Sequence, residues 1–159
     1  MRMPPYVAVV GPGEASSSET EVAEAVGRGL GESGAIVICG GLGGVMAAAC
    51  RGASAVGGLT VGILPGADRS AANQWIQIAI PTGMGELRNG LVARAGDAVI
   101  AIGGEFGTLS EIGFALKLGR PVVGLGTWEL ARGGQGVDAI EVADGPRDAV
   151  ARALALARR

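Results

Sequence analysis

Residues 98–117 read AVIAIGGEFGTLSEIGFALK, and this stretch decides the fold. Its first five residues, Ala98–Ile102, form an apolar run of strand length, and a glycine-rich turn over residues 103–107 follows at once. Thr108 and Glu111 then form a Thr-x-x-Glu pattern, which predicts a capping box at the start of a helix. A strand, a glycine turn and a helix N-terminus in succession predict an anion site, because free backbone N–H groups and the helix dipole favour negative charge.

The composition predicts one domain with an aliphatic core. The chain has 159 residues, which is enough for one domain over residues 1–159 and too few for two. Hydrophobic residues make up 48% of it but aromatic residues only 3%, so valine, isoleucine, leucine and alanine must build the core. Most of the 30 glycines fall at the ends of apolar runs, which predicts tight turns rather than low complexity.

Charge and residue usage exclude several classes of function. A net charge of −2 gives no electrostatic footprint for nucleic acid. The chain has no histidine, which excludes histidine-based triads and most zinc sites, and two cysteines alone do not predict a metal site. Acid–base chemistry would therefore fall to carboxylates or to Tyr6. Cys39 and Cys50 are lone thiols in a chain without a secretory leader, which predicts a reducing, cytoplasmic setting. Glycines interrupt the uncharged stretch 33–50, so we expect no membrane span.

Apolar runs of strand length alternate with helical segments along the chain. The predicted strands are Tyr6–Val10, 35–39, 59–64, 77–80, Ala98–Ile102 and Val122–Leu125, with a short edge strand at 139–142. The predicted helices cover 18–30, Val45–Ala55, 84–95, 108–117 and a last segment from Pro146, and a Ser18-x-x-Glu21 pattern predicts a capping box for the first of them. Residues 127–137 are expected to be irregular.

This alternation predicts an α/β fold of three layers: a Rossmann-like open sheet, mostly parallel, with helices on both faces. The strands are continuous apolar runs, which is typical of strands buried on both faces. Right-handed crossovers put the carboxyl ends of parallel strands at one edge of the sheet, and ligands bind at that edge. The loops over residues 11–18, 40–44, 65–73 and 103–107 would lie there.

The standard nucleotide-binding motifs are incomplete or absent. The first loop, GPGEAS, lacks the third glycine of the dinucleotide fingerprint, and Cys39 stands where that motif needs an acidic residue. The chain contains no G-x-x-x-x-G-K-[ST] sequence, which excludes a P-loop NTPase.

Two other glycine motifs carry a family resemblance. GGLGGVM at residues 40–46 and GGEFGTLSE at residues 103–111 are similar to the G-G-G-x-x-G-x-M and P-G-G-x-G-T-x-x-E motifs of the LOG-like family, often labelled "lysine decarboxylase-like". The resemblance extends from Tyr6 to about Leu125. It implies a Rossmann-like protein from a group that includes cytokinin-activating phosphoribohydrolases and, among its shorter members, molybdenum cofactor carrier proteins.

The resemblance also implies a set of site residues. Gly107, Thr108 and Glu111 match the second motif, and Arg88 matches the arginine that the family's hydrolases use with the glutamate. If the protein is an enzyme, Glu111 and Arg88 are the expected catalytic residues. The expected ligand- and phosphate-binding residues are Gly11, Ser16, Ser17, Gly40, Gly41, Gly43, Gly44, Met46, Gly103, Gly104, Gly107 and Thr108.

Each of these residues also has a structural interpretation. Glu111 could serve only as a helix cap, Arg88 could form a surface salt bridge, and Ser16 to Ser18 could cap a helix. The glycines at 40–44 could merely allow close packing. Trp75 and Trp128 are interpreted as packing or subunit-interface residues.

Four departures from the family motifs favour the shorter, carrier-type branch. Gly103 replaces the proline and Glu105 the second glycine of the second motif. Ser110 stands where hydrolases have the first glutamate of G-T-x-E-E, and Asn89 where a lysine usually follows the arginine. A carboxylate at Glu105 would repel a phosphate unless it points away from the ligand.

Three hypotheses follow from these patterns. The first is a binding or carrier protein for a phosphorylated nucleotide or cofactor, with the molybdenum cofactor or a nucleoside monophosphate as possible ligand and no cofactor required. The second is a nucleoside 5′-monophosphate phosphoribohydrolase that cleaves the N-glycosidic bond, and the third is a ligand-sensing assembly protein. Lysine decarboxylation is rejected, because Lys117, the only lysine, has no plausible pyridoxal context. We expect a homodimer or homotetramer and neither a nucleic-acid nor a membrane partner.

Overall fold

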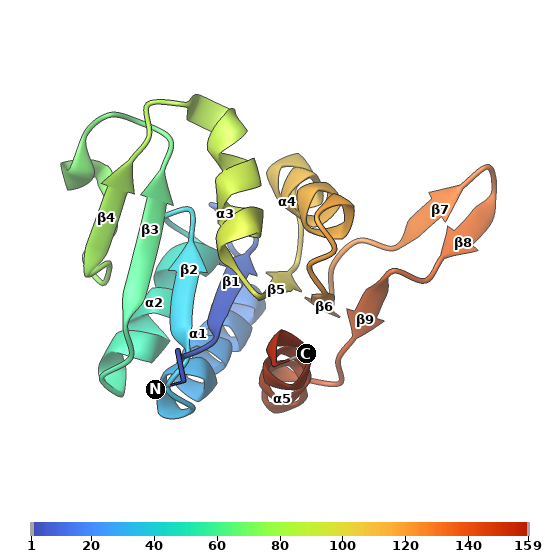
Figure 1. The fold of residues 1–159 in the computed structure, drawn as a ribbon, viewed down its shortest axis with the longest axis horizontal. Coiled ribbons are helices and arrows are strands. Elements are labelled where there is room, and N and C mark those ends of the chain that lie inside the picture. The colour runs from blue at the N-terminus through green and yellow to red at the C-terminus, as the bar shows by residue number, and fades with distance from the viewer. Residues whose placement is uncertain (1, 159) are drawn as a thin grey trace.

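The computed structural model describes residues 2–158 and shows a seven-stranded sheet with helices on both faces (Figure 1). The strand order is β4-β3-β2-β1-β5-β6-β9, and every neighbouring pair is parallel. The strands of this sheet are β1 Tyr6–Val10, β2 Ile36–Cys39, β3 Thr60–Leu64, β4 Ile78–Pro81, β5 Ala98–Ile102, β6 Val122–Leu125 and β9 Ile140–Val142. The predicted three-layer, Rossmann-like α/β fold is confirmed.

The helices divide into two layers. They are α1 Ser17–Glu32, α2 Val45–Ala55, α3 Asn89–Ala95, α4 Phe106–Lys117 and α5 Pro146–Ala157. One core cluster joins the sheet to α1, α2 and α5, and a second joins it to α3 and α4. Strand β1 is apolar because both of its faces are buried. Val7 and Val9 belong to the first cluster, whereas Ala8 and Val10 belong to the second.

The order of the strands reverses beside β1. The chain builds β1 to β4 outward in one direction and then returns to place β5 on the other side of β1, with Val10 opposite Ala101. In open α/β sheets the crevice at such a reversal, at the carboxyl ends of the strands, is where ligands bind. The loops after β1, β2 and β5 therefore surround the expected position of a ligand.

Helices α1 and α2 touch through their backbones. A Cβ atom on Gly27 of α1 would lie 1.9 Å from the carbonyl oxygen of Ala49, and one on Gly52 of α2 would lie 2.0 Å from that of Glu24. Any side chain at either position would force the helices apart. These glycines serve the packing of the two helices, away from the glycine loops.

Both predicted capping boxes are wrong in register. Helix α1 is capped by Ser16, whose hydroxyl accepts from the Glu19 N–H at 3.2 Å while the Ser16 N–H donates to the Glu19 carboxylate at 3.0 Å. The sequence SSSETE offers the same Ser-x-x-Glu spacing twice, and the earlier one is used. Helix α4 begins after Glu105, whose extended backbone (φ −110°, ψ −179°) forms the N-cap. Thr108 is thus the third helical residue, and Glu111 lies inside the helix.

Two further segments differ from the prediction. The helix expected over residues 84–95 is a 3₁₀ turn, Gly85–Arg88, followed by α3, and it starts from Gly85 at φ +59°. The segment expected to be irregular contains an antiparallel hairpin, β7 Leu130–Arg132 and β8 Gln135–Val137, which projects from the sheet (Figure 1). Gly133 and Gly134 connect its strands with φ of +59° and +80°, as a two-residue hairpin turn requires.

None of the helices within residues 2–158 is long and apolar enough to cross a bilayer.

Candidate functional site

Three glycine loops meet at the carboxyl edge of the sheet. The Val45 N–H donates to the Pro12 carbonyl at 3.0 Å, which joins the loop after β2 to the loop after β1. Gly44 has a φ of +62°, and a Cβ atom there would lie 2.2 Å from the same Pro12 oxygen. On the other side, a Cβ atom on Gly11 would lie 2.6 Å from the Ile102 carbonyl at the end of β5. The structure thus brings the predicted loops together, and the close approach of their backbones requires glycine.

Hydrogen bonds from Asn73 and to Cys39 hold the loop after β2 in place. Asn73 binds it twice, through its N–H to the Gly41 carbonyl at 2.9 Å and through Nδ2 to the Leu42 carbonyl at 2.9 Å. The Gly41 N–H donates to the Cys39 Sγ at 3.3 Å, and the Cys39 and Cys50 sulfurs lie 3.6 Å apart in the core. Sequence reasoning placed residues 65–73 at this edge but did not single out Asn73. An amide side chain in a loop beside glycines was the available signal.

Helices α2 and α4 both begin at this edge, and they differ in how their N-termini are capped. Helix α2 follows Gly44 and has no side-chain cap, whereas Glu105 is the N-cap of α4 and forms a capping box with Thr108. Free N–H groups and the helix dipole make such ends favourable for anions. Helix α1 differs, because Ser16 already caps it and Ser17 is exposed at its first position.

Arg88 is a buried residue that joins three elements. Its side chain is 7% exposed, Nε donates to the Ile63 carbonyl of β3 at 2.9 Å, and a terminal nitrogen lies 3.4 Å from the Gly40 carbonyl. The other terminal nitrogen donates to Asn89 Oδ1. Across residues 2–158 it forms no salt bridge, so the alternative of a surface ion pair is wrong. The guanidinium is instead fixed at the carboxyl ends of β2 and β3.

Glu111 is buried without a partner of its own. It is 8% exposed, and within the described part of the chain its carboxyl group forms neither a hydrogen bond nor a salt bridge. Burial raises the pKa of Glu111 from 4.5 to about 8, since the positive charge of Arg88 opposes this shift only in part and the negative charge of Glu86 adds to it. The carboxyl is therefore mostly neutral at pH 7. Glu111 is not a helix cap, so that alternative is wrong.

Two of the four departures from the family motifs, Asn89 and Ser110, contact each other. Asn89 Nδ2 donates to Ser110 Oγ at 3.0 Å, and the Ser110 hydroxyl donates to the Gly107 carbonyl at 2.6 Å. Because Asn89 also accepts from Arg88, a continuous chain of hydrogen bonds connects Arg88 to the first turn of α4. The sequence showed both departures, but it gave no sign that they are neighbours.

The remaining predicted residues have varied surroundings. Thr108 is buried, and its hydroxyl accepts from the Glu105 N–H at 3.4 Å. Glu105 itself is exposed at the rim. A Cβ atom on Gly103 would meet the Glu19 carboxylate at 2.6 Å, and Met46 lies over Gly40, with its sulfur 2.9 Å from where a Cβ of that glycine would be. Gly43 is exposed, and its Cβ would meet only the Gly13 carbonyl, at 3.4 Å.

Two cavities adjoin the turn after β5. One, of about 520 Å³, is lined by Ser16, Glu19, Gly103 and Asp144 on the side of α1 and α5. The other, of about 390 Å³, is lined by Gly103, Gly104, Gly126, Thr127, Trp128 and Glu129. Arg88 and Glu111 line neither of them and lie on the side covered by α3 and α4. The structure thus separates Ser16 from these two residues.

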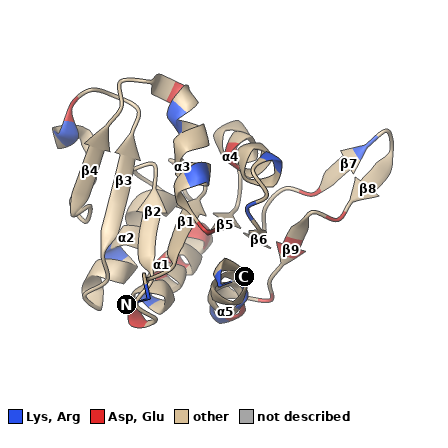
Figure 2. Ribbon diagram, in the orientation of Figure 1, with Lys and Arg blue, Asp and Glu red and all other residues tan. Residues whose placement is uncertain are grey.

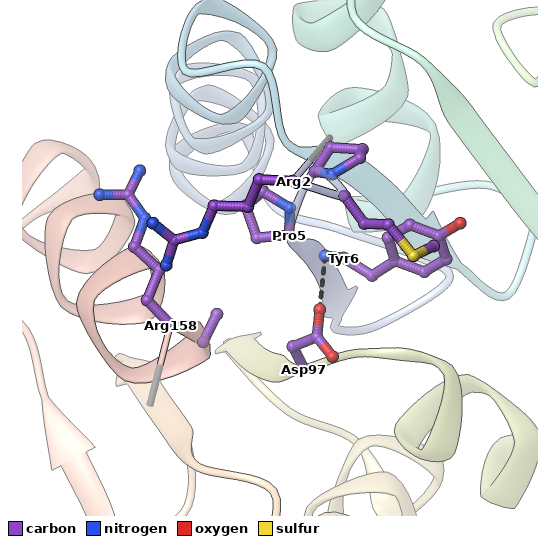
Figure 3. A pocket seen from close by; sticks show the side chains of 8 residues that line it. Arg2, Pro5, Tyr6, Asp97 and Arg158 are labelled. Carbon is purple, nitrogen blue, oxygen red and sulfur yellow. Dashed lines mark hydrogen bonds between the residues drawn. The ribbon is translucent and has the colours of Figure 1, made fainter.

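A further cavity, of about 630 Å³, lies at the opposite edge of the sheet (Figure 3). It is lined by residues near both ends of the chain, including Arg2 and Arg158. The Asp97 carboxylate is already engaged there, since it accepts from the Tyr6 N–H at 2.9 Å. Strands begin at this edge, so it contains none of the glycine loops.

A parallel sheet with glycine loops at its strand-order reversal defines a Rossmann-like protein. Residues 4–150 match the SLOG cluster4 family, and the chain belongs to that family. The sequence resemblance is thereby confirmed.

Known proteins resemble the chain over most of its length. It is 43% identical over 119 residues to an uncharacterized protein of Archaeoglobus fulgidus, which covers 75% of this chain and 78% of that one. The molybdenum cofactor binding protein of Rippkaea orientalis superposes with a TM-score of 0.84 at 31% identity, covering 96% of both chains. The molybdenum cofactor carrier protein of Chlamydomonas reinhardtii superposes with a TM-score of 0.85 at 29% identity, covering 99% of this chain and 100% of that one.

Proposed function

We propose that the protein binds and carries a phosphorylated cofactor or nucleotide, with the molybdenum cofactor as the leading ligand. The observation that carries this proposal is the pair of helix N-termini, α2 and α4, which begin directly after glycine loops on either side of β1. A phosphate there would accept hydrogen bonds from backbone N–H groups in a positive helix field. The similarity to molybdenum cofactor carrier proteins, at 29–31% identity over nearly the whole chain, supports this choice of ligand.

The electrostatics beside the loops suit an anion. Arg88 supplies a fixed positive charge, and the buried Glu111 carboxyl is mostly neutral at pH 7 because its pKa is raised to about 8. Glu105 is the one carboxylate of the turn, and as the N-cap of α4 it competes with an anion there, so the uncapped α2 is the more favourable of the two helix N-termini for a phosphate.

The choice between carrier and hydrolase depends on charge. Asn89 and Ser110 form a neutral pair, at 3.0 Å, where the hydrolases of the family have a lysine and a glutamate. Loss of both charges removes groups that could move protons, which favours binding without turnover. The hydrolase stays the second candidate, because Arg88 and Glu111 are both retained and lie close enough to interact electrostatically.

We also propose that residues 1–159 form one domain and that this domain self-associates. An apolar face lies on the α3 side of the sheet, where Ile78 and Ile80 of β4 share the side of Val61 and Ile63. The exposed residues of this apolar face are Ile78, Ile80, Met84, Leu87, Leu91 and Phe114. Strands β3 and β4 carry no charged residue (Figure 2). Such a face is typical of a subunit interface, so we propose a homodimer or homotetramer. It also keeps open the third hypothesis, a sensor whose ligand changes assembly.

The test of the function uses a charge placed in the first turn of α4. Gly107→Asp has open space around it, with Asn89 Nδ2 3.8 Å away as its nearest neighbour. A carboxylate there stabilises the helix through its dipole but repels an anion. The protein is incubated with molybdenum cofactor released from a molybdoenzyme and, separately, with nucleoside monophosphates. Retained ligand and released base are then measured after desalting. We expect retention without base release, and at least tenfold weaker retention in Gly107→Asp at unchanged thermal stability.

Gly113→Asp is the matched control, because Gly113 lies on the same helix, exposed and with nothing within 4 Å of its Cβ position. Equal retention by Gly107→Asp and the wild-type protein would exclude an anion at α4. Rapid release of free base from a monophosphate would establish the hydrolase instead, and loss of that release in Glu111→Gln would assign the acid.

A further inference from the structure

Aromatic residues are scarce in this chain, and two of them meet beside the glycine turn. The sequence has only two phenylalanines, two tryptophans and one tyrosine. Phe106, the first residue of α4, and Trp128, in the loop after β6, have ring centroids 5.8 Å apart and planes tilted by 30°. Phe106 is 79% exposed, which leaves most of its ring surface to solvent. A large apolar ring in such a position is unfavourable unless something else covers it.

Trp128 is fixed in place by the turn itself. Its indole Nε1 donates to the Glu105 carbonyl at 3.2 Å. A Cβ atom on Gly104 would lie 2.5 Å from the same nitrogen, so the glycine at position 104 makes room for the indole. The phosphate-binding turn and the aromatic pair are thus built as one unit. Sequence reasoning interpreted Trp128 as a packing or interface residue and did not connect it with Phe106.

A cavity of about 390 Å³ lies beside Trp128, and one of the residues that line it has an unsatisfied polar atom. Thr127 lines it, and Thr127 Oγ1 is a buried side-chain atom without a hydrogen-bond partner among residues 2–158. Buried hydroxyls normally have a partner, and leaving one without is unfavourable. This oxygen lies 3.5 Å from the Cβ position of Gly104. Glu129 also lines the cavity, so its rim is acidic and suits a ring that carries N–H donors.

We propose that Phe106 and Trp128 form a stacking subsite for a planar, amino-substituted nitrogen heterocycle, the ring part of the ligand whose phosphate binds at the glycine loops. Thr127 Oγ1 gains a hydrogen-bond partner at the edge of the ring when the Thr127 side chain turns toward the cavity. Flat heterocycles stack on aromatic side chains, and a single stacked ring contributes about a tenfold to hundredfold gain in affinity. Phe106 and Gly107 are consecutive residues, so one small ligand reaches both the subsite and the N-terminus of α4. This subsite rests on the proposed function.

The experiment separates the ring from the phosphate. Wild-type protein and Phe106→Ala are titrated calorimetrically with the molybdenum cofactor, with guanosine 5′-monophosphate and with ribose 5-phosphate, which has a phosphate but no ring. We expect Phe106→Ala to weaken binding of the ring-bearing probes at least tenfold and to leave ribose 5-phosphate binding unchanged. Phe106→Trp restores the loss. Phe114→Ala, on the same helix but two turns further on, is the control and leaves all affinities unchanged.

The outcomes that overturn the inference are distinct. If Phe106→Ala binds every probe as the wild-type protein does, the stacking subsite is wrong while the phosphate site stands. If Phe106→Ala alters the oligomeric state with unchanged affinities, Phe106 is a subunit contact and not a ligand contact. If the wild-type protein binds none of the three probes, the proposed function fails and the subsite with it. Equal melting temperatures of the variants exclude a folding defect as the cause of any loss.

Discussion

The carboxyl group of Glu111 shows how its surroundings change the chemistry of a single residue. In the sequence it is an acid in a glycine motif. In the structure it is buried and unpaired, and its raised pKa, about 8, makes it a neutral hydrogen-bond donor over most of the physiological pH range. The neighbouring guanidinium of Arg88 is held by backbone carbonyls of two strands rather than by this carboxylate. A ligand anion would therefore meet one positive and one neutral group.

The raised pKa of Glu111 predicts a pH-dependent stability. Its pKa is about 8 when folded and about 4.5 when unfolded, so the folded state binds more protons between these values. Stability is then highest below pH 4.5 as far as this group is concerned, and it falls by up to roughly 1.4 kcal/mol per pH unit until pH 8. We expect Glu111→Gln to remove this slope, measured by thermal unfolding from pH 5 to pH 9. Glu21→Gln, at an exposed position of α1, should keep it. Parallel wild-type and Glu111→Gln curves would contradict the prediction.

At the scale of the element, the glycines have two different uses. Gly11 and Gly44 let loops approach at the carboxyl edge of the sheet, whereas Gly27 and Gly52 let α1 and α2 pack backbone against backbone. At Gly27 and Gly52 the contact between these helices leaves no space for a larger side chain, because the nearest atoms belong to the backbone and cannot move away by a change of rotamer. Exposed helical glycines such as Gly113 have neither use.

Alanine substitutions in two helices should therefore have opposite effects. Gly52→Ala would place a Cβ 2.0 Å from the Glu24 carbonyl, and we expect it to destabilise the fold by about 1–3 kcal/mol through overpacking. Gly113→Ala has open space and should stabilise the fold by about 0.5–1 kcal/mol, because alanine is the better helix former. Denaturant unfolding of both variants measures the difference. A Gly52→Ala variant as stable as the wild-type protein would show that the helices can separate freely.

The elements also show what a sequence can and cannot predict. The strands and the carboxyl-edge loops were predictable, because continuous apolar runs and their bounding glycines depend on local pattern alone. The first residues of the helices were less predictable. Ser16 and Ser18 both stand three residues before a glutamate, and only the path of the chain determines that Ser16 is the cap. The β7–β8 hairpin was missed because each strand has only three residues, too few to show a pattern, although Gly133-Gly134 marked the turn. Contacts between distant segments, such as Asn89 with Ser110, carry no local signal at all.

At the scale of the whole molecule, one side of the sheet is incompletely covered. Helices α3 and α4 protect the core around β1 and β5, but they leave β4 and part of their own surface apolar and exposed (Figure 1). Met84, Leu87 and Leu91 recur at helical spacing on this apolar face, and Leu87 is 70% exposed. Burying such a face against a second copy would stabilise both chains.

The proposed self-association can be tested with a single charge. Leu87→Glu should shift the protein toward monomer, because an uncompensated carboxylate is unfavourable in an apolar interface. Analytical ultracentrifugation over a range of concentrations measures the shift. Val142→Glu is the control, since Val142 is 71% exposed on β9 and lies outside the apolar face. A wild-type protein that is monomeric throughout, or a Leu87→Glu variant that assembles normally, would contradict the proposal.

The backbone contact between α1 and α2 bears on how natural variation in this protein is interpreted. A survey of tolerated substitutions would mark positions 27 and 52 as invariant, and it would mark positions 11 and 44 equally strongly. Only the second pair lies at the carboxyl edge. A ligand site located from intolerance alone would thus extend to a helix–helix contact that lies away from the glycine loops. Separate measurement of folding and of binding for each glycine variant is what distinguishes them.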